Sequence, residues 1–170
     1  MLTLRDATAS DRGMLEELGA GTYRSHFTAI WSPQRLEAYI AAEYGPAALE
    51  RSLQDAGSAW LIAELDATPI GFAKLNWDRT LPIAPGRSGT ELQKIYLHAE
   101  QTGKGWGGAL LQAVIARAQQ RRERLIWLDV LKSNSGARAF YARHGFDVVG
   151  EIPFATDLQE IGMCVMARDL

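Results

Sequence analysis

The sequence predicts a single α/β (α+β) domain over residues 1–170, with a mixed, mostly antiparallel sheet of about seven strands and helices on both faces. Two observations support this fold class. Strand and helix patterns follow the order strand, two or three helices, three strands, helix, strand, helix and two strands. The segment from Glu91 to Val130 also forms a strand–helix–strand unit, and a right-handed crossover makes its two strands parallel.

The first half of the chain combines one strand, several helices and a hairpin. Ser32 is a good N-cap and Pro33 suits the first position of a helix, while Gly45 and Pro46 end it. The expected elements are a strand at Leu2–Ala7, a helix at about Asp11–Thr28, a helix over 33–44, a helical piece to about Asp55, and hairpin strands over 59–65 and 70–77.

The second half alternates strands and helices after an expected loop. Residues 78–89, "DRTLPIAPGRSG", hold two prolines and two glycines, which predict a loop. The elements expected after it are a strand at Glu91–His98, a helix at Gly105–Arg122, a strand over 124–130, a helix at Asn134–His144, and strands over 146–152 and 160–170.

Composition excludes several classes of function. The formal charge of −2, with only a mild acidic excess in residues 1–90, predicts neither a nucleic-acid nor a membrane partner. A single cysteine, Cys164, allows no intrachain disulfide and no cysteine zinc site, and the three histidines lack metal-ligand spacing, so we expect no metal. The absence of a signal-peptide pattern favours a cytoplasmic protein. The sequence leaves open whether the chain is a monomer or a homodimer.

A glycine-rich turn precedes the helix predicted at 105–122. Gly103, Gly105, Gly107 and Gly108 are followed at once by apolar residues at helical spacing. The first turn of a helix has free backbone N–H groups and the positive end of the helix dipole, so the turn suits a phosphate or pyrophosphate. The alternative is a tight strand–helix turn in which the glycines serve packing only.

Two common phosphate motifs fit this turn poorly. The spacing formally satisfies G-x-G-x-x-G, and Asp129 ends the next strand where a ribose-binding acid would lie. The glycines, however, come past mid-chain and leave too few residues for the usual run of parallel strands. The P-loop pattern fails because Lys104 is followed by Gly105 rather than by Ser or Thr.

A second motif follows at 134–146, "NSGARAFYARHGF". Apolar positions spaced by three and four residues predict an amphipathic helix, and Gly145 suits its C-cap. Together the two motifs resemble the GCN5-related N-acetyltransferases, whose acetyl-CoA motif R/Q-x-x-G-x-G/A reads here Thr102, Gly105 and Gly107. The family pattern N-x-x-A-x-x-F-Y-x-x-x-G-F is complete here as Asn134, Ala137, Phe140, Tyr141, Gly145 and Phe146.

The resemblance covers nearly the whole chain. Within the family, the sequence is similar to the bacterial spermidine/spermine N-acetyltransferases through the segments "SPQRLEAYIAAEY", "PIGFAKLNW", "ELQKIYL" and "LIWLDV". It implies an acetyl-CoA-dependent N-acetyltransferase that acts on a primary amine, a polyamine in that branch. Thr102 replaces the usual Arg or Gln, so we expect weaker but not abolished binding of CoA. A peptide or protein amine, an aminoglycoside, and a non-catalytic acyl-CoA-binding module are the alternatives.

The resemblance also implies which residues bind acetyl-CoA as a co-substrate. The Leu97 backbone N–H is expected to stabilise the oxyanion, and Asn134 to bind the pantetheine arm, cap a helix, or do both. The implied cofactor-binding residues are Ile95, Tyr96, Leu97, Thr102, Gly103, Lys104, Gly105, Trp106, Gly107, Gly108, Asn134, Ala137 and Phe140.

Two side chains are candidates for proton transfer. Tyr141 suits a general acid for the departing thiolate, because a tyrosine pKa of about 10 keeps the hydroxyl protonated near neutral pH. Glu91 suits a general base, acting directly or through a water, since related acetyltransferases place a glutamate at this offset before the turn. Strand alternation places Glu91 on one face with Gln93, Ile95 and Leu97. The alternatives are an ordinary core tyrosine and a solvated glutamate.

Aromatic residues between the first two helices are candidates for acceptor binding. Tyr23, Phe27 and Trp31, with His26 beside them, lie where this family closes its acceptor site. An aromatic wall attracts a cationic amine through cation–π contact. The alternative is a plain hydrophobic contact between two helices.

Overall fold

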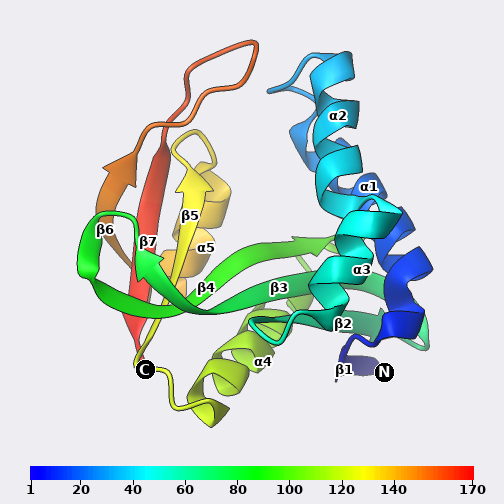
Figure 1. The fold of residues 1–170 in the computed structure, drawn as a ribbon, viewed down its shortest axis with the longest axis horizontal. Coiled ribbons are helices and arrows are strands. Elements are labelled where there is room, and N and C mark those ends of the chain that lie inside the picture. Colours follow the sequence, from blue (N-terminus) through cyan, green and yellow to red (C-terminus); the bar gives the residue numbers. More distant parts are fainter.

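The computed structural model describes residues 1–170 and contains one seven-stranded sheet with the strand order β1-β2-β3-β4-β5-β7-β6 (Figure 1). Neighbouring strands are antiparallel except β4 and β5, which are parallel as predicted. The strands are β1 (Leu2–Asp6), β2 (Ser58–Leu65), β3 (Thr68–Leu81), β4 (Ala84–Leu97), β5 (Leu125–Leu131), β6 (Asp147–Ile152) and β7 (Met163–Asp169).

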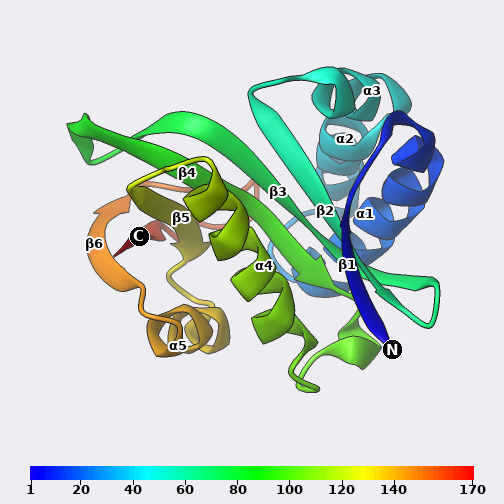
Figure 2. The ribbon, with the colours of Figure 1, turned by 90° about the horizontal axis from the view of Figure 1, so that it is seen from below.

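Helices cover both faces of the sheet (Figure 2). They are α1 (Arg12–Phe27), α2 (Pro33–Tyr44) and α3 (Pro46–Gln54) on one face, and α4 (Trp106–Gln120) and α5 (Ser135–Arg143) on the other. A large apolar core lies between the sheet and α4 and α5, and a second lies between the sheet and α1–α3. No helix is both long enough and apolar enough to span a bilayer.

The sequence signals at the helix ends act as predicted. The Ser32 hydroxyl accepts a hydrogen bond from the Arg35 N–H, and Pro33 begins α2. Gly45 separates α2 from α3, which begins with Pro46. At α5, the Asn134 Oδ1 accepts from the Ala137 N–H at 3.1 Å, so Asn134 is the N-cap.

The loop predicted over 78–89 is wrong. β3 continues to Leu81 and β4 starts at Ala84, which makes a long hairpin. Pro82 lies in the turn, and the register shifts after Thr80 leave Pro85 outside the ladder, so neither proline removes a sheet hydrogen bond. Prolines and glycines therefore occur at the irregular positions of a strand pair rather than in a loop.

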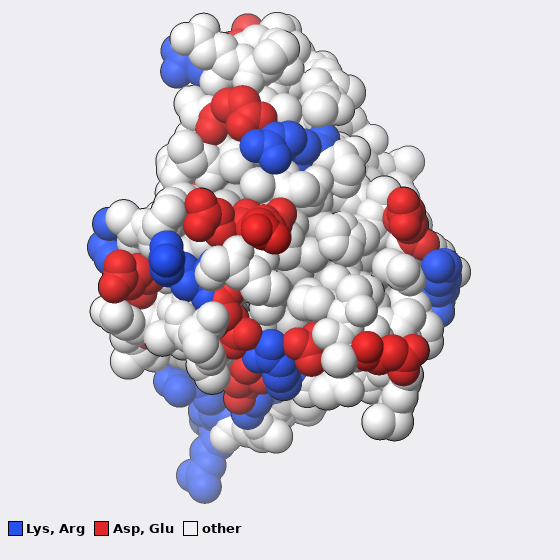
Figure 3. Space-filling model, turned by 90° about the vertical axis from the view of Figure 1, so that its right-hand side faces the viewer, with Lys and Arg blue, Asp and Glu red and all other residues white.

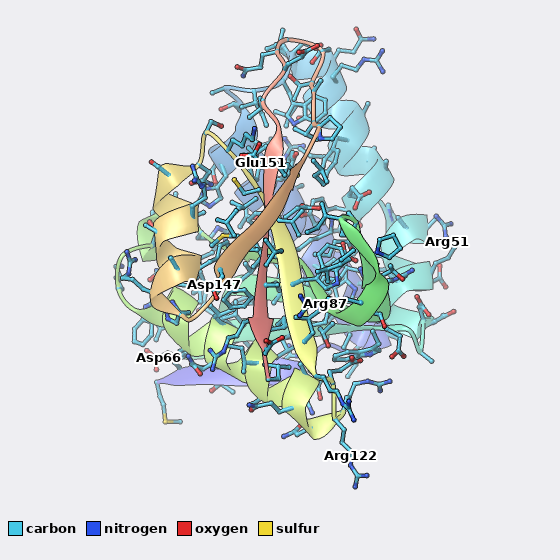
Figure 4. The ribbon with its side chains drawn as sticks, turned by 90° about the vertical axis from the view of Figure 1, so that its left-hand side faces the viewer. Arg51, Asp66, Arg87, Arg122, Asp147 and Glu151 are labelled. Carbon is cyan, nitrogen blue, oxygen red and sulfur yellow. The ribbon has the colours of Figure 1, made fainter.

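The parallel pairing of β4 and β5 is very short. Only Thr90 with Ile126, and Glu91 with Trp127, are paired, and beyond them the two strands diverge, as their arrows show in Figure 1. β5 continues instead along β7, which pairs with β6; Figure 4 shows these three strands side by side, with Asp147 and Glu151 marking β6. The sheet therefore opens between its two halves.

Gly89 permits the close approach that starts this pairing. A Cβ on Gly89 would lie 2.3 Å from the carbonyl oxygen of Leu125, a backbone atom that cannot move aside alone. We expect Gly89→Ala to lower the free energy of unfolding by about 3 kcal/mol, near the upper part of the range for overpacked sites. Urea unfolding measures this loss. Gly86→Ala is the control, because nothing lies within 4 Å of its Cβ, and equal stability of the two variants would contradict the explanation.

Candidate active site

A cavity of about 780 Å³ opens where β4 and β5 diverge. Its walls include most residues that the sequence singles out: Tyr23, His26, Phe27, Glu91, Ile95, Tyr96, Leu97, Thr102, Gly103, Gly107, Asn134, Ala137, Phe140 and Tyr141. Five predicted residues do not line it: Trp31, Lys104, Gly105, Trp106 and Gly108. Four of these belong to the glycine turn, next to the lining residues Gly103 and Gly107.

The glycine turn presents an unbroken run of free backbone donors. None of the N–H groups from Gly103 to Gly108 donates a hydrogen bond within the protein. Gly103 and Gly105 have φ of +75° and +87°, a conformation that glycine adopts without strain. The Thr102 hydroxyl donates to the Ala99 carbonyl at 2.7 Å, so this side chain is bound to its own turn. The amides therefore form a cradle for an anion without help from Thr102.

The end of β4 also directs a free amide into the gap between the strands. Because the His98 N–H donates to the Ile70 carbonyl at 2.9 Å, Leu97 and its partner Gly71 form a non-hydrogen-bonded pair. The N–H and C=O of Leu97 consequently point away from β3, toward the side where β5 has separated. The His26 Nε2 lies 2.9 Å from the Leu97 carbonyl oxygen, which leaves the N–H as the free group.

A bulge at Gln93 overturns the predicted orientation of Glu91. Leu75 pairs with Leu92 and Lys74 with Lys94, so Gln93 is an extra residue in β4. The extra residue reverses the alternation, which puts Glu91 on the face of α1–α3 with Lys94 and Tyr96, whereas Ile95 and Leu97 face α4. The predicted shared face was therefore wrong.

The same bulge gives Glu91 a defined hydrogen-bond partner. The buried Asn76 side chain on β3 donates to the Glu91 Oε2 at 2.8 Å and to the Gln93 Oε1 at 3.2 Å. The Glu91 Oε1 accepts no hydrogen bond from the protein, and the residue lines the cavity. Glu91 is thus an oriented carboxylate with one free side.

Tyr141 reaches the cavity from α5 on the other side of the gap. The residue is 9% exposed, and its ring packs edge-on against Phe140 and Phe146. Burial, and then the negative charge of Asp129, raise the pKa of the Tyr141 hydroxyl well above its ordinary value. Tyr141 therefore stays protonated at neutral pH and can act as a donor.

The aromatic residues of α1 and α2 form one wall of the cavity. Tyr23 stacks on Tyr39 and lies against Phe27, both at 4.4 Å between ring centroids. Trp31 stands behind this wall, where its Nε1 donates to the Tyr23 hydroxyl at 3.1 Å. Phe154, between β6 and β7, completes the lining.

Three charged residues line the cavity although the sequence analysis does not predict them as site residues: Asp129, Lys94 and Glu43. Asp129 lies on β5, and burial together with Glu91 raises the pKa of its carboxyl. Lys94 is 4% exposed, and its Nζ is 2.7 Å from the Glu43 Oε2 of α2. Asp129 was considered in the sequence analysis only as a ribose-binding acid, in a motif that fits poorly. The sequence carries no signal for the Lys94–Glu43 pair, because its partners are 51 residues apart.

The model of the acetyltransferase (GNAT) family matches residues 22–146, and the chain belongs to this family. It is an acetyl-CoA-dependent N-acetyltransferase, and its sheet has the fold of that family. The chain is 28% identical over 161 residues to an uncharacterised N-acetyltransferase of Mycobacterium bovis, which covers 95% of this chain and 99% of that protein.

Other relatives share parts of the sequence or only the fold. A Pseudomonas aeruginosa L-methionine sulfoximine/L-methionine sulfone acetyltransferase is 32% identical over 68 residues, 40% of each chain. The PaiA N-acetyltransferase of Thermoplasma acidophilum, solved with coenzyme A, superposes with a TM-score of 0.80 at 23% identity, over 100% of this chain and 99% of that one. YncA of Salmonella typhimurium, solved with acetyl-CoA, superposes with a TM-score of 0.67 at 20% identity, over 100% of this chain and 94% of that one.

Proposed function

We propose that the chain transfers an acetyl group directly from acetyl-CoA to a primary amine in a ternary complex, with Glu91 as general base and Tyr141 as general acid. One observation carries this proposal. Glu91 and the free Leu97 N–H, both on β4, and Tyr141 on α5 all border one cavity, which also reaches the glycine turn. The whole chain is proposed to act as a single domain.

The residues present fit acetyl-CoA as a co-substrate. The free N–H groups from Gly103 to Gly108 suit its pyrophosphate, and Gly103 and Gly105 adopt the positive φ of this turn without strain. Asn134 and Ala137 at the start of α5 line the space between this turn and Tyr141. Acetyl-CoA would supply the acetyl group as a thioester, a carbonyl carbon that a neutral amine can attack.

Each of the three groups has a separate task in the transfer. Glu91 accepts a proton from the acceptor nitrogen, which must be neutral to attack although an alkylamine has a pKa of about 10.4. The Leu97 N–H donates to the carbonyl oxygen as negative charge develops on it. Tyr141 donates its proton to the departing sulfur as the carbon–sulfur bond breaks, and regains a proton from solvent.

A covalent cysteine intermediate does not fit this arrangement. Cys164, the only cysteine, is buried in the core on β7 and does not line the cavity. Direct attack by the amine is therefore the simpler route. A non-catalytic acyl-CoA-binding module, the alternative class, would need neither an oriented Glu91 nor a cavity-facing Tyr141. Release of CoA only when a primary amine is present tests the enzyme against that module.

A polyamine acceptor rests on the resemblance to the spermidine/spermine branch and on the mild acidic excess of residues 1–90. The outer face of α1–α3 adds little to it, because Figure 3 shows acidic and basic side chains interspersed there rather than gathered in one acidic field. Peptide amines and aminoglycosides stay as alternative acceptors. Comparing these amines at low and high salt separates them, since polyamine binding weakens as salt screens its several charges.

Binding of the co-substrate gives a prediction of its own. We expect CoA to raise the melting temperature of the protein and NAD to leave it unchanged. Gly105→Val should reduce the CoA-induced shift, because Gly105 lies within the run of free amides and a branched side chain there takes up space that the ligand needs. Thermal unfolding with and without ligand measures both effects.

A second variant separates blocked binding from backbone strain. Gly105 has a positive φ, so Val there is strained and lowers stability by itself. Gly107 lies in the first turn of α4 and has no positive φ. The Cβ of a valine there would meet only side chains, at 3.7 Å or more, so Gly107→Val is the second variant. It should also weaken CoA binding. Unchanged CoA affinity in both variants would place the cradle elsewhere.

A further inference from the structure

Three polar side chains are joined at the bulge of β4. The Asn76 Nδ2 donates to the Glu91 Oε2 at 2.8 Å and to the Gln93 Oε1 at 3.2 Å. Asn76 is only 5% exposed and does not line the cavity, whereas Glu91 and Gln93 both do. The inference drawn from this group concerns the amine acceptor and therefore rests on the proposed function.

The carboxylate of Glu91 determines how the Asn76 amide is turned. An ionised carboxylate only accepts hydrogen bonds, so the end of the amide that faces it must be the NH2 group. The two hydrogens of Nδ2 then supply the two bonds, one for each partner. The buried amide keeps this orientation, because turning it over would leave its donors unpaired and set its oxygen against the carboxylate.

Asn76 determines the orientation of Gln93 in the same way. Gln93 must present its oxygen to the donating Nδ2, so its own NH2 group is turned away from Asn76. No group of the protein accepts a hydrogen bond from the Gln93 Nε2, and the residue lines the cavity. The Gln93 amide is therefore an oriented donor in the same cavity as Glu91.

The group leaves one free acceptor and one free donor close together. The free acceptor is the Glu91 Oε1, and the free donor is the Gln93 Nε2. The two bonded oxygens share one nitrogen whose N–H bonds diverge by about 120°, so these oxygens are roughly 5 Å apart. About two or three carbon atoms bridge such a gap between an amine nitrogen and an oxygen.

From this arrangement we infer that the acceptor is a primary amine with a hydrogen-bond-accepting oxygen, such as a hydroxyl or an ether, on its second or third carbon. The nitrogen gives its proton to the Glu91 Oε1, and the oxygen accepts a hydrogen bond from the Gln93 Nε2. Gln93 thus determines specificity. Asn76 is a positioning residue, because it touches no substrate and fixes the direction of both contacts.

Three amines of equal length test the inference: pentylamine, 2-ethoxyethylamine and 3-methoxypropylamine. Each ether has an oxygen in place of one methylene group of pentylamine, and an ether oxygen can accept a hydrogen bond but cannot donate one. We expect kcat/KM for the better ether to exceed that for pentylamine by roughly three- to tenfold, the contribution of one neutral hydrogen bond.

Replacing Gln93 by Met should abolish this preference. The variant keeps the length of the side chain and removes its NH2 group, so the ratio of the ether to pentylamine should fall by roughly the same three- to tenfold. The ethers are weaker bases than pentylamine, and comparing the ratio between native protein and variant cancels this difference. Gln112→Met is the matched control, because Gln112 is exposed on α4 and does not line the cavity.

Asn76→Asp tests the positioning role. It keeps the size of the side chain and replaces the donor by an oxygen, which releases Gln93 and repels Glu91. The preference for the ether should be lost as in Gln93→Met, and kcat should fall by roughly tenfold or more while the KM for acetyl-CoA stays nearly unchanged. A purely structural role of Asn76 would lower stability and leave the ratio of the two amines as it is.

The inference is overturned by pentylamine used as well as both ethers, or by a ratio that Gln93→Met leaves unchanged. Circular dichroism and the CoA-induced thermal shift show whether each variant is folded, and Gln93→Met, at an exposed position, keeps the test if Asn76→Asp does not fold. If calorimetry of the CoA-bound protein shows the ether preference but acetyl-CoA gives no CoA release, the proposed function fails and the inference stands. Equal CoA release with all three amines means the reverse.

Discussion

Replacing Tyr141 by Phe should lower kcat by about 10²–10⁴-fold, the usual contribution of a general acid. The substitution removes one hydroxyl and keeps the ring that packs against Phe140 and Phe146. Folding and CoA affinity should therefore survive. The measurement is kcat at saturating acetyl-CoA and amine, with the melting temperature and the dissociation constant of CoA as controls.

The pH dependence of the native enzyme supplies a further check on Tyr141. Its pKa is raised by burial and by Asp129, so the hydroxyl stays protonated while the amine substrate loses its proton. Activity should rise with pH toward the amine pKa of about 10.4. Deprotonation of Tyr141 should cause no loss of activity below that pH. An unchanged kcat in the Phe variant would return Tyr141 to a purely structural role in the core.

Glu91→Gln should lower kcat by about 10²-fold or more and leave the KM for acetyl-CoA nearly unchanged. The amide keeps the size of the side chain and can still bond to Asn76, but it cannot accept the proton of the acceptor nitrogen. The residual activity should depend more steeply on pH than in the native enzyme, because the amine must then lose its proton to water. Steady-state kinetics across pH measure both effects.

The control for Glu91 is a glutamate outside the cavity. Glu50→Gln, on the exposed side of α3, removes one carboxylate without touching β4 and should leave kcat within about twofold, as surface substitutions usually do. If Glu91→Gln behaves like Glu50→Gln, the base lies elsewhere, and Asp129 is the next carboxylate in the same cavity.

Local signals account for what the sequence predicts well. Ser32, Pro33 and Gly45 define α2 through capping chemistry that involves only neighbouring residues. The glycines of the turn indicate both the positive φ values and the free amides, because both are properties of a few consecutive residues. The parallel pairing of β4 and β5 follows from the handedness of one crossover.

Predictions were wrong or missing for features that depend on pairing between residues far apart in the sequence. Alternation assumes an unbroken strand, so it cannot reveal the bulge at Gln93, which the register against Lys74 and Leu75 produces. The prolines of 78–89 predict a loop, because the sequence does not show that the register shifts avoid them. The sequence does not distinguish Lys94 from any other lysine of a strand, because its partner Glu43 lies on α2, 51 residues away.

The central claim is direct acetyl transfer from acetyl-CoA to an amine held in the cavity between β4 and β5. Initial rates of CoA release, measured while acetyl-CoA and pentylamine are both varied, test it most directly. We predict that CoA is released in step with acetylated amine and that the double-reciprocal lines intersect, as a ternary complex requires. Parallel lines, or CoA release at the same rate without any amine, would contradict the account.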